Sequence, residues 1–185
     1  MWIWGDSLVA DVALRALPSI HGMDLGLGAR YDVQWKRNPG LSYPELLDLL
    51  SQELKTQRTL PIAILFQAKG DGILESPLHE LRSKTYDFFE VIRSLNQAPI
   101  LVWSDIPPHS TQARMDTINS LEDKRRKINR LARSEAQRCG GDVVANTLAP
   151  DHYWLFQEEE HRELSALGLD CLLGAWAHRL QELLM

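Results

Sequence analysis

Short apolar runs alternate with longer amphipathic segments along the whole chain. The apolar runs are too short to be helices, and they predict strands at residues 2–4, 31–35, 61–66, 99–103 and 142–145. The longer segments carry apolar residues at helical spacing, and they predict helices at residues 7–17, 43–55, 78–95, 117–138 and 165–184. The expected order is therefore a regular alternation of strand and helix.

Strands that are apolar almost throughout and separated by helices are typical of a parallel sheet buried on both faces. Right-handed crossovers then place helices on each face. We therefore predict an α/β fold, a three-layer α/β/α sandwich with a five-stranded, mostly parallel sheet. The 185 residues, 44% of them hydrophobic, suffice for one compact domain over residues 1–185. Ligands bind such folds outside the carboxyl ends of the strands.

Charge and cysteine content exclude several classes of protein. The net charge of −5 gives no overall attraction for nucleic acids or anionic membranes. The basic run at residues 124–127 follows two acidic residues, which favours a solvated helix face over a phosphate-binding patch. The two cysteines match neither a zinc site nor a disulfide framework, so we expect no metal. With no visible signal peptide and no transmembrane segment, we expect a cytoplasmic, intracellular location.

The turn after the first strand has the sequence Gly5-Asp6-Ser7-Leu8. Glycine can adopt a backbone conformation that other residues avoid, and the amides of a helix N-terminus point outward. Such a turn can present the Ser7 hydroxyl as a nucleophile and can stabilise an oxyanion. The simpler interpretation is an ordinary helix cap, because aspartate and serine both cap helices well.

Other loops at the same edge of the sheet carry further candidates. Gly40, after the second strand, can lend a backbone N–H to an oxyanion, and it also suits a simple turn after proline. Gly70 and Asp71 follow the third strand beside the expected cleft. After the fourth strand, Asp105 and His109 supply a carboxylate and an imidazole in a proline-rich loop.

A general base completes a nucleophilic site, and histidine is the usual choice near neutral pH. Of the six histidines, His161 stands out because it lies just before the last helix and Glu158 lies three residues earlier. A carboxylate at that spacing can orient an imidazole. His152 can also reach the cleft. The acidic neighbours Glu160 and Glu163 are candidate cleft residues, although this cluster also suits a solvated helix start.

Together these features resemble the SGNH (GDSL) hydrolases over nearly the whole chain. The details are most similar to the esterase-like domain in the first open-reading-frame protein of vertebrate LINE retrotransposons. That resemblance is carried by five runs: residues 2–7, residues 31–35 with Gly40, residues 123–129, residues 140–144 and residues 164–168.

The resemblance implies that Ser7 is the nucleophile, that the N–H groups of Ser7 and Gly40 bind the oxyanion, and that no cofactor is needed. Two departures from the family pattern are visible. The family has a Gly-x-Asn-Asp block after the third strand, whereas this chain reads Ala68-Lys69-Gly70-Asp71 and lacks the asparagine. An alignment without gaps on Leu164-Ser165 places Glu163 at the catalytic histidine position, and a slip of two residues brings His161 there.

Two functions remain open at this point. One is a serine esterase or acetyl hydrolase, acting on small acyl esters or a lipid through Ser7, His161 and Glu158. The other is a non-catalytic SGNH fold, a pseudoenzyme of retrotransposon origin that binds a protein, a lipid, RNA or a second copy of itself. A flavodoxin-like nucleotide binder shares the topology but would need a phosphate loop that this sequence lacks.

Overall fold

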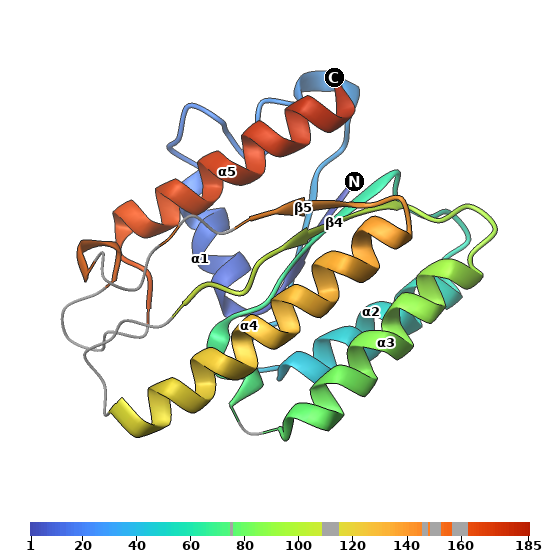
Figure 1. The fold of residues 1–185 in the computed structure, drawn as a ribbon. Coiled ribbons are helices and arrows are strands. Elements are labelled where there is room, and N and C mark those ends of the chain that lie inside the picture. The colour runs from blue at the N-terminus through green and yellow to red at the C-terminus, as the bar shows by residue number, and fades with distance from the viewer. Residues whose placement is uncertain (75, 109–114, 146–147, 149–152, 157–162) are drawn as a thin grey trace.

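The computed structural model describes residues 1–74, 76–108, 115–145, 148, 153–156 and 163–185 (Figure 1). Its strands are β1 (Trp2–Gly5), β2 (Gln34–Arg37), β3 (Ala63–Gln67), β4 (Ile100–Ser104) and β5 (Asp142–Val144). Its α-helices are α1 (Ser7–Ala16), α2 (Tyr43–Thr56), α3 (Leu78–Ser94), α4 (Met115–Arg138) and α5 (Ala166–Leu184). Short 3₁₀ helices span Gly28–Arg30, Gly70–Ile73 and Tyr153–Leu155.

The strands form one parallel sheet in the order β2-β1-β3-β4-β5. The chain moves outward from β1 to β2, and then crosses back to β3 on the other side of β1. Strand order therefore reverses at β1 and β3, where a doubly wound sheet opens a crevice for ligands. The loops after these two strands begin at Asp6 and Ala68, and that of the neighbouring β2 begins at Asn38.

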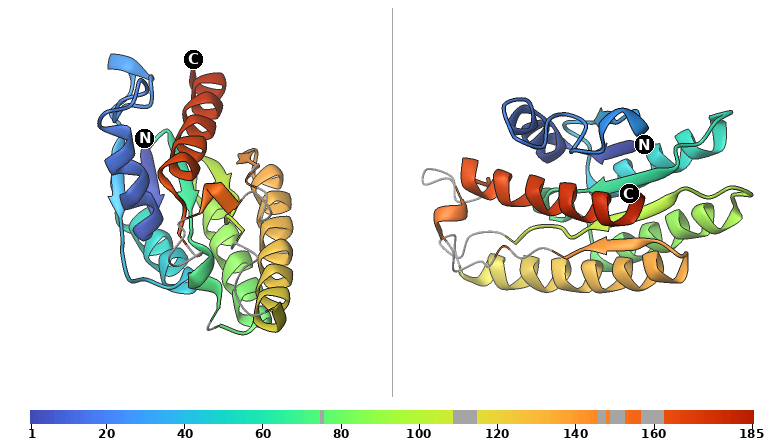
Figure 2. Two further views of the ribbon diagram at one scale, coloured as in Figure 1. Left: turned by 90° about the vertical axis from the view of Figure 1, so that its left-hand side faces the viewer. Right: turned by 90° about the horizontal axis from the view of Figure 1, so that it is seen from above.

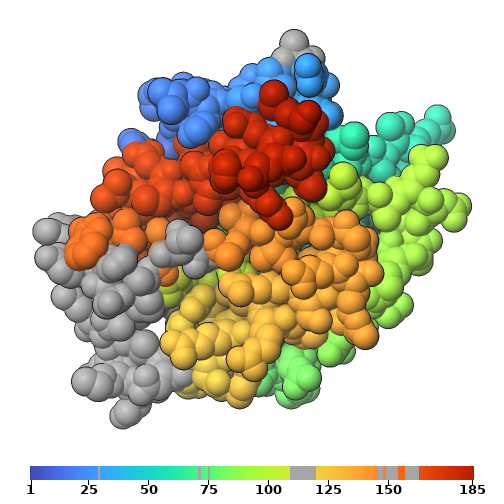
Figure 3. Space-filling view, turned by 45° about the horizontal axis from the view of Figure 1, so that its top comes forward, coloured from blue at the N-terminus to red at the C-terminus, as the bar shows by residue number. Residues whose placement is uncertain are grey.

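Helices cover both faces of the sheet, as the two views in Figure 2 show. Successive residues of β3 point to opposite faces: Ala63 and Leu65 pack with α1 and α5, while Ile64 and Phe66 pack with α2, α3 and α4. The second face is rich in aromatic residues, with Phe66 stacked on Trp103 at 4.7 Å between ring centroids. On the surface drawn in Figure 3, α5 lies between the N-terminal segment and α4.

The predicted fold class is confirmed, and the element bounds differ at a few places. The second strand begins at Gln34, three residues later than predicted, and ends at Arg37, two residues later than predicted. Its partner β1 begins only at Trp2, which pairs with Gln34, so residues 31–33 have no strand to pair with. The Gly70–Asp71 segment, expected as a turn, is a 3₁₀ helix. No helix within the described ranges is long and apolar enough to span a bilayer.

Candidate active site

The turn between β1 and α1 separates the roles of Asp6 and Ser7. Asp6 is the N-cap of α1, and its carboxylate accepts a hydrogen bond of 2.9 Å from the Leu8 N–H. Ser7 is the first residue of the helix, and its side chain does not cap it. The helix-cap interpretation is therefore confirmed for Asp6 and does not hold for Ser7. Aspartate is the cap, and the serine hydroxyl is left at a helix N-terminus.

The Asp6 carboxylate also joins two loops. Its second oxygen accepts a hydrogen bond of 2.6 Å from the Lys69 N–H, at the start of the loop after β3. Asp6 is only 4% exposed, and burial raises the pKa of its carboxyl group. The two backbone N–H donors and the charge of Lys69 act in the opposite direction. This carboxylate therefore fixes the Ser7 turn against β3.

Gly5 is required by close packing between strands. It has no left-handed φ, so the expectation of an unusual backbone conformation there is wrong. A Cβ atom at Gly5 would instead lie 2.1 Å from the Gln67 carbonyl oxygen and 2.5 Å from Val9 Cγ2. Absence of a side chain lets β1 and β3 stay paired up to the start of the Ser7 turn.

Gly40 lies close to Ser7 because the β2 loop is tied to the end of β1. The Asn38 N–H donates a hydrogen bond of 2.8 Å to the Gly5 carbonyl, which extends the pairing of β2 with β1. The following turn at Pro39 and Gly40 places Gly40 at φ +85°, a conformation that favours glycine. Within the part of the chain that the structure describes, neither the Gly40 N–H nor the Ser7 N–H donates a hydrogen bond.

An open depression of about 250 Å³ lies where these loops meet. It is lined by Asp6, Ser7, Gly40, Leu41, Ser42, Lys69 and Gly72. Ser42 is the N-cap of α2, and its hydroxyl donates to the Glu45 carboxylate at 2.7 Å. The Ser7 hydroxyl makes no hydrogen bond to any residue among those described. Of the two serines that line this depression, Ser7 is therefore the one whose hydroxyl has no hydrogen-bond partner among the described residues.

A charged group borders the depression, and sequence reasoning did not assign it a role. Lys69 Nζ forms an ion pair of 3.0 Å with Glu163 Oε1, which joins the β3 loop to the segment before α5. The charges of Lys69 and Glu163 both shift the pKa of Asp11, which lies one helical turn after Ser7. Burial raises the pKa of Asp11, the Glu163 carboxylate raises it further, and the Lys69 ammonium lowers it. The spacing of four residues between Ser7 and Asp11 is the signal that places both on one side of α1.

Only some of the predicted site residues lie in the part of the chain that the structure describes. Ser7, Asp6 and Gly40 line one depression, and Gly70 and Asp71 belong to the 3₁₀ helix after β3. Glu163 does not line the depression and forms an ion pair with Lys69, which does. Glu158, Glu160 and His161 lie outside the described residues, as do the alternative bases His109 and His152. The structure therefore leaves the identity of the base as a prediction.

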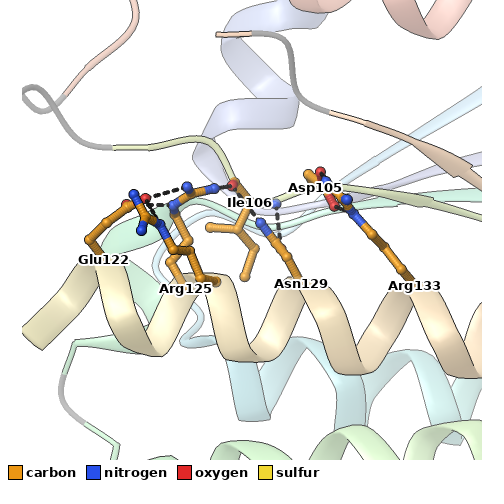
Figure 4. A network of polar contacts seen from close by, with 7 residues as sticks. Asp105, Ile106, Glu122, Arg125, Asn129 and Arg133 are labelled. Atoms are coloured by element: carbon orange, nitrogen blue, oxygen red, sulfur yellow. Dashed lines mark hydrogen bonds and ion pairs between the residues drawn. The ribbon is translucent and has the colours of Figure 1, made fainter. Parts of the chain in front are cut away.

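The candidate carboxylate after β4 is a structural group. Asp105 is 1% exposed and forms an ion pair with Arg133 of α4 (Figure 4). Nearby, Asn129 donates to the Ile106 carbonyl and accepts from the Ile106 N–H, each at 3.0 Å. These contacts hold the β4 loop on α4, and Asp105 does not line the Ser7 depression.

The basic run on α4 is largely neutralised by its neighbours. Arg125 and Arg126 both pair with Glu122, and Lys127 pairs with Asp123 (Figure 4 shows Arg125 and Glu122). Lys124 donates to the carbonyls of Leu74 and Ser76. This arrangement fits the solvated helix face that the sequence favours.

The described residues contain no cluster of three or more side chains suited to a metal ion. No protein-family model matches the chain, and no curated protein matches its sequence significantly. Solved structures, in contrast, resemble it over nearly their whole length.

A lipase/acylhydrolase from Enterococcus faecalis aligns with a TM-score of 0.67 and 12% identity, covering 98% of this chain and 94% of the other. A member of the lipolytic protein G-D-S-L family from Veillonella parvula aligns with a TM-score of 0.66 and 14% identity, covering 99% and 96%. A carbohydrate acetylesterase from Sinorhizobium meliloti aligns with a TM-score of 0.70 and 13% identity, covering 98% of both chains. At these identities the likeness is one of fold: the chain has the α/β fold of the SGNH (GDSL) hydrolases.

Proposed function

We propose that this protein hydrolyses small acyl esters, with Ser7 as the nucleophile. One observation carries the proposal: Asp6 takes the capping role in the Ser7 turn and leaves the Ser7 hydroxyl in a depression shared with Gly40. The structural neighbours include a lipase/acylhydrolase and a carbohydrate acetylesterase, which supports the same chemistry. The depression, about 250 Å³ in volume, has room for a small acyl group such as acetyl.

In the proposed reaction, Ser7 Oγ bonds to the ester carbonyl carbon while the hydroxyl proton passes to a general base. The carbonyl π electrons move to the oxygen, which accepts hydrogen bonds from the N–H groups of Ser7 and Gly40. Collapse of this intermediate expels the alcohol with a proton from the base and leaves an acyl-enzyme. Water then repeats the attack and releases the acid. We assign the base to His161 and its orientation to Glu158, with His152 and His109 as the alternative bases.

The test is turnover of p-nitrophenyl acetate by the wild type, Ser7→Ala and Ser94→Ala. Ser94 ends α3, which leads into the opposite end of the sheet, so its loss should not change the rate. Ser7→Ala should lower kcat by about a thousandfold or more, because the remaining groups have no nucleophile to assist. A fluorophosphonate should label the peptide containing Ser7 and should leave Ser42 unlabelled. Equal background rates in wild type and Ser7→Ala would refute hydrolysis.

We further infer that the chain derives from the esterase-like domain of a LINE first-open-reading-frame protein. The support is the set of sequence runs, among them residues 2–7 and 164–168. A reverse-transcriptase reading frame downstream of the gene would support this origin, and an unrelated operon around the gene would contradict it.

A further inference from the structure

We propose that the Lys69 ammonium stabilises the oxyanion formed when Ser7 attacks an ester, and that Glu163 positions Lys69 while partly cancelling its charge. The inference rests on the proposed esterase function. It assigns a role to the residue directly before Gly70, which stands where the sequence resemblance expects the asparagine.

The position of Lys69 supports this role. Its N–H is bound to the Asp6 carboxylate, so its backbone is fixed next to the Ser7 turn. Its side chain is 18% exposed, and Lys69 is among the residues that line the same depression as Ser7 and Gly40. Lys69 therefore borders the space in which an ester carbonyl must lie for Ser7 to attack it.

The charge of Lys69 acts on both sides of the nucleophile. It lowers the pKa of Asp6, which precedes Ser7, against the larger effect of burial. It also lowers the pKa of Asp11, one turn beyond Ser7. Because the charge of Lys69 acts on carboxylates on both sides of the first turn of α1, it also acts on an oxyanion at the N-terminus of this helix. The helix dipole there acts in the same direction.

Glu163 has two opposing effects in this arrangement. Its ion pair with Lys69 restrains the ammonium between the β3 loop and the segment before α5. The carboxylate is 41% exposed, and its negative charge reduces the field that Lys69 exerts on the oxyanion. As Ser7 Oγ bonds to the carbonyl carbon, the π pair moves to oxygen and the proton goes to the base. Lys69 forms no covalent bond in this step.

The two residues of the pair are therefore expected to act in opposite directions. Lys69→Met should lower kcat for p-nitrophenyl acetate by about 10- to 100-fold with a smaller change in KM, because the charge acts mainly on the transition state. Lys69→Arg should restore most of the rate. Glu163→Gln should raise kcat by about two- to fivefold, because the amide keeps a hydrogen-bond acceptor and removes the opposing charge.

The ion pair of Lys84 with Asp48 is the matched control. It joins α2 and α3 through the same type of ammonium–carboxylate contact and lies outside the depression. Lys84→Met and Asp48→Asn should leave kcat unchanged, and thermal unfolding should show that all variants fold. If Lys69→Met has the wild-type kcat, the proposed role of Lys69 is wrong. If Glu163→Gln lowers kcat, the proposed opposing effect of the Glu163 charge is wrong. Ser7→Ala measured alongside separates the two proposals, because its loss of turnover upholds the esterase function whatever Lys69 does.

Discussion

The Asp6 carboxylate accepts a hydrogen bond of 2.6 Å from the Lys69 N–H, 63 residues further along the chain. This contact joins the ends of β1 and β3, the two strands between which strand order reverses. The same carboxylate caps α1 through the Leu8 N–H. The buried Asp6 carboxylate thus sets the position of Ser7 relative to the β3 loop. Substitutions around it should show which residues affect the free energy of unfolding and which affect the rate of ester hydrolysis.

Gly5→Ala should destabilise the protein by about 3 kcal/mol, because the new Cβ would lie 2.1 Å from a backbone carbonyl oxygen that cannot move independently. Urea unfolding measures this effect. The control is Gly174→Ala in α5, where a Cβ would meet nothing within 4 Å. That substitution should stabilise the protein by about 0.5–1 kcal/mol through helix propensity. Equal stability of the two variants would contradict the close-packing role of Gly5.

Asp6→Ala should lower the free energy of unfolding by about 2–4 kcal/mol, because the N–H groups of Leu8 and Lys69 both lose their acceptor. Asp6→Asn keeps one acceptor and should cost less. Burial raises the pKa of Asp6 in the folded state, so the wild type binds this proton more tightly when folded.

The stability that Asp6 contributes through this proton is fully present below the unfolded pKa of 3.8 and is lost as pH rises through the folded pKa. The stability of wild type relative to Asp6→Asn should therefore decrease between pH 4 and pH 8. Denaturant unfolding of both proteins across this range measures the difference. A relative stability that rises with pH would contradict the buried state of this carboxylate.

Glu135→Gln should destabilise the protein by about 1–2 kcal/mol at pH 7, because the buried carboxylate accepts hydrogen bonds from Arg93 at 2.8 Å and Arg138 at 3.1 Å. These contacts lower the pKa of Glu135 below 4.5 against the effect of burial. Its stabilisation is present above pH 4.5 and is lost as pH falls through the folded pKa. The gap between wild type and variant should therefore close in acid, as thermal unfolding from pH 7 to pH 3 would show.

Most of the fold could be predicted because each strand and helix has its own hydrophobic period. The β2 start could not, because it depends on where β1 begins and on the pairing of Trp2 with Gln34. The Ser7–Gly40 depression follows from topology, since parallel strands bring their carboxyl ends to one edge. The charge of Lys69 near Ser7 could not be read from the sequence, because its ion pair with Glu163 spans 94 residues and depends on tertiary packing.

The RNA-binding alternative depends on the basic residues of α4. A groove of about 390 Å³ along this helix is lined by Arg125, Arg126, Arg130 and Arg133 among others, yet acidic groups pair with three of these four. We expect fluorescence anisotropy with a single-stranded RNA at low salt to show only weak, non-specific binding, with Kd of about 10⁻⁶ M or weaker. Tight binding that falls steeply with salt and is lost in Arg126→Glu/Arg130→Glu would overturn this expectation.

A comparison of Gly40 with Gly140, which both have a positive φ, separates the role of Gly40 in the site from its role in folding. Gly40 and Gly140 have φ of +85° and +72°, and a Cβ at either would meet nothing within 4 Å. Alanine at each position should therefore cost a similar amount, about 1–2 kcal/mol, because only the left-handed backbone is strained. Gly140 follows α4 and precedes β5, at the opposite end of the sheet from Ser7.

Only Gly40→Ala should affect ester hydrolysis, since relaxing its strain turns the Gly40 N–H away from the Ser7 depression. We expect kcat for p-nitrophenyl acetate to fall by about tenfold or more, as for loss of an oxyanion donor, with little change in KM. Gly140→Ala should keep the wild-type rate while losing the same stability. Equal rates in the two variants would remove Gly40 from the proposed oxyanion site. The Ser7 N–H would then have to act with another donor, for which Lys69, a lining residue of the same depression, is a candidate.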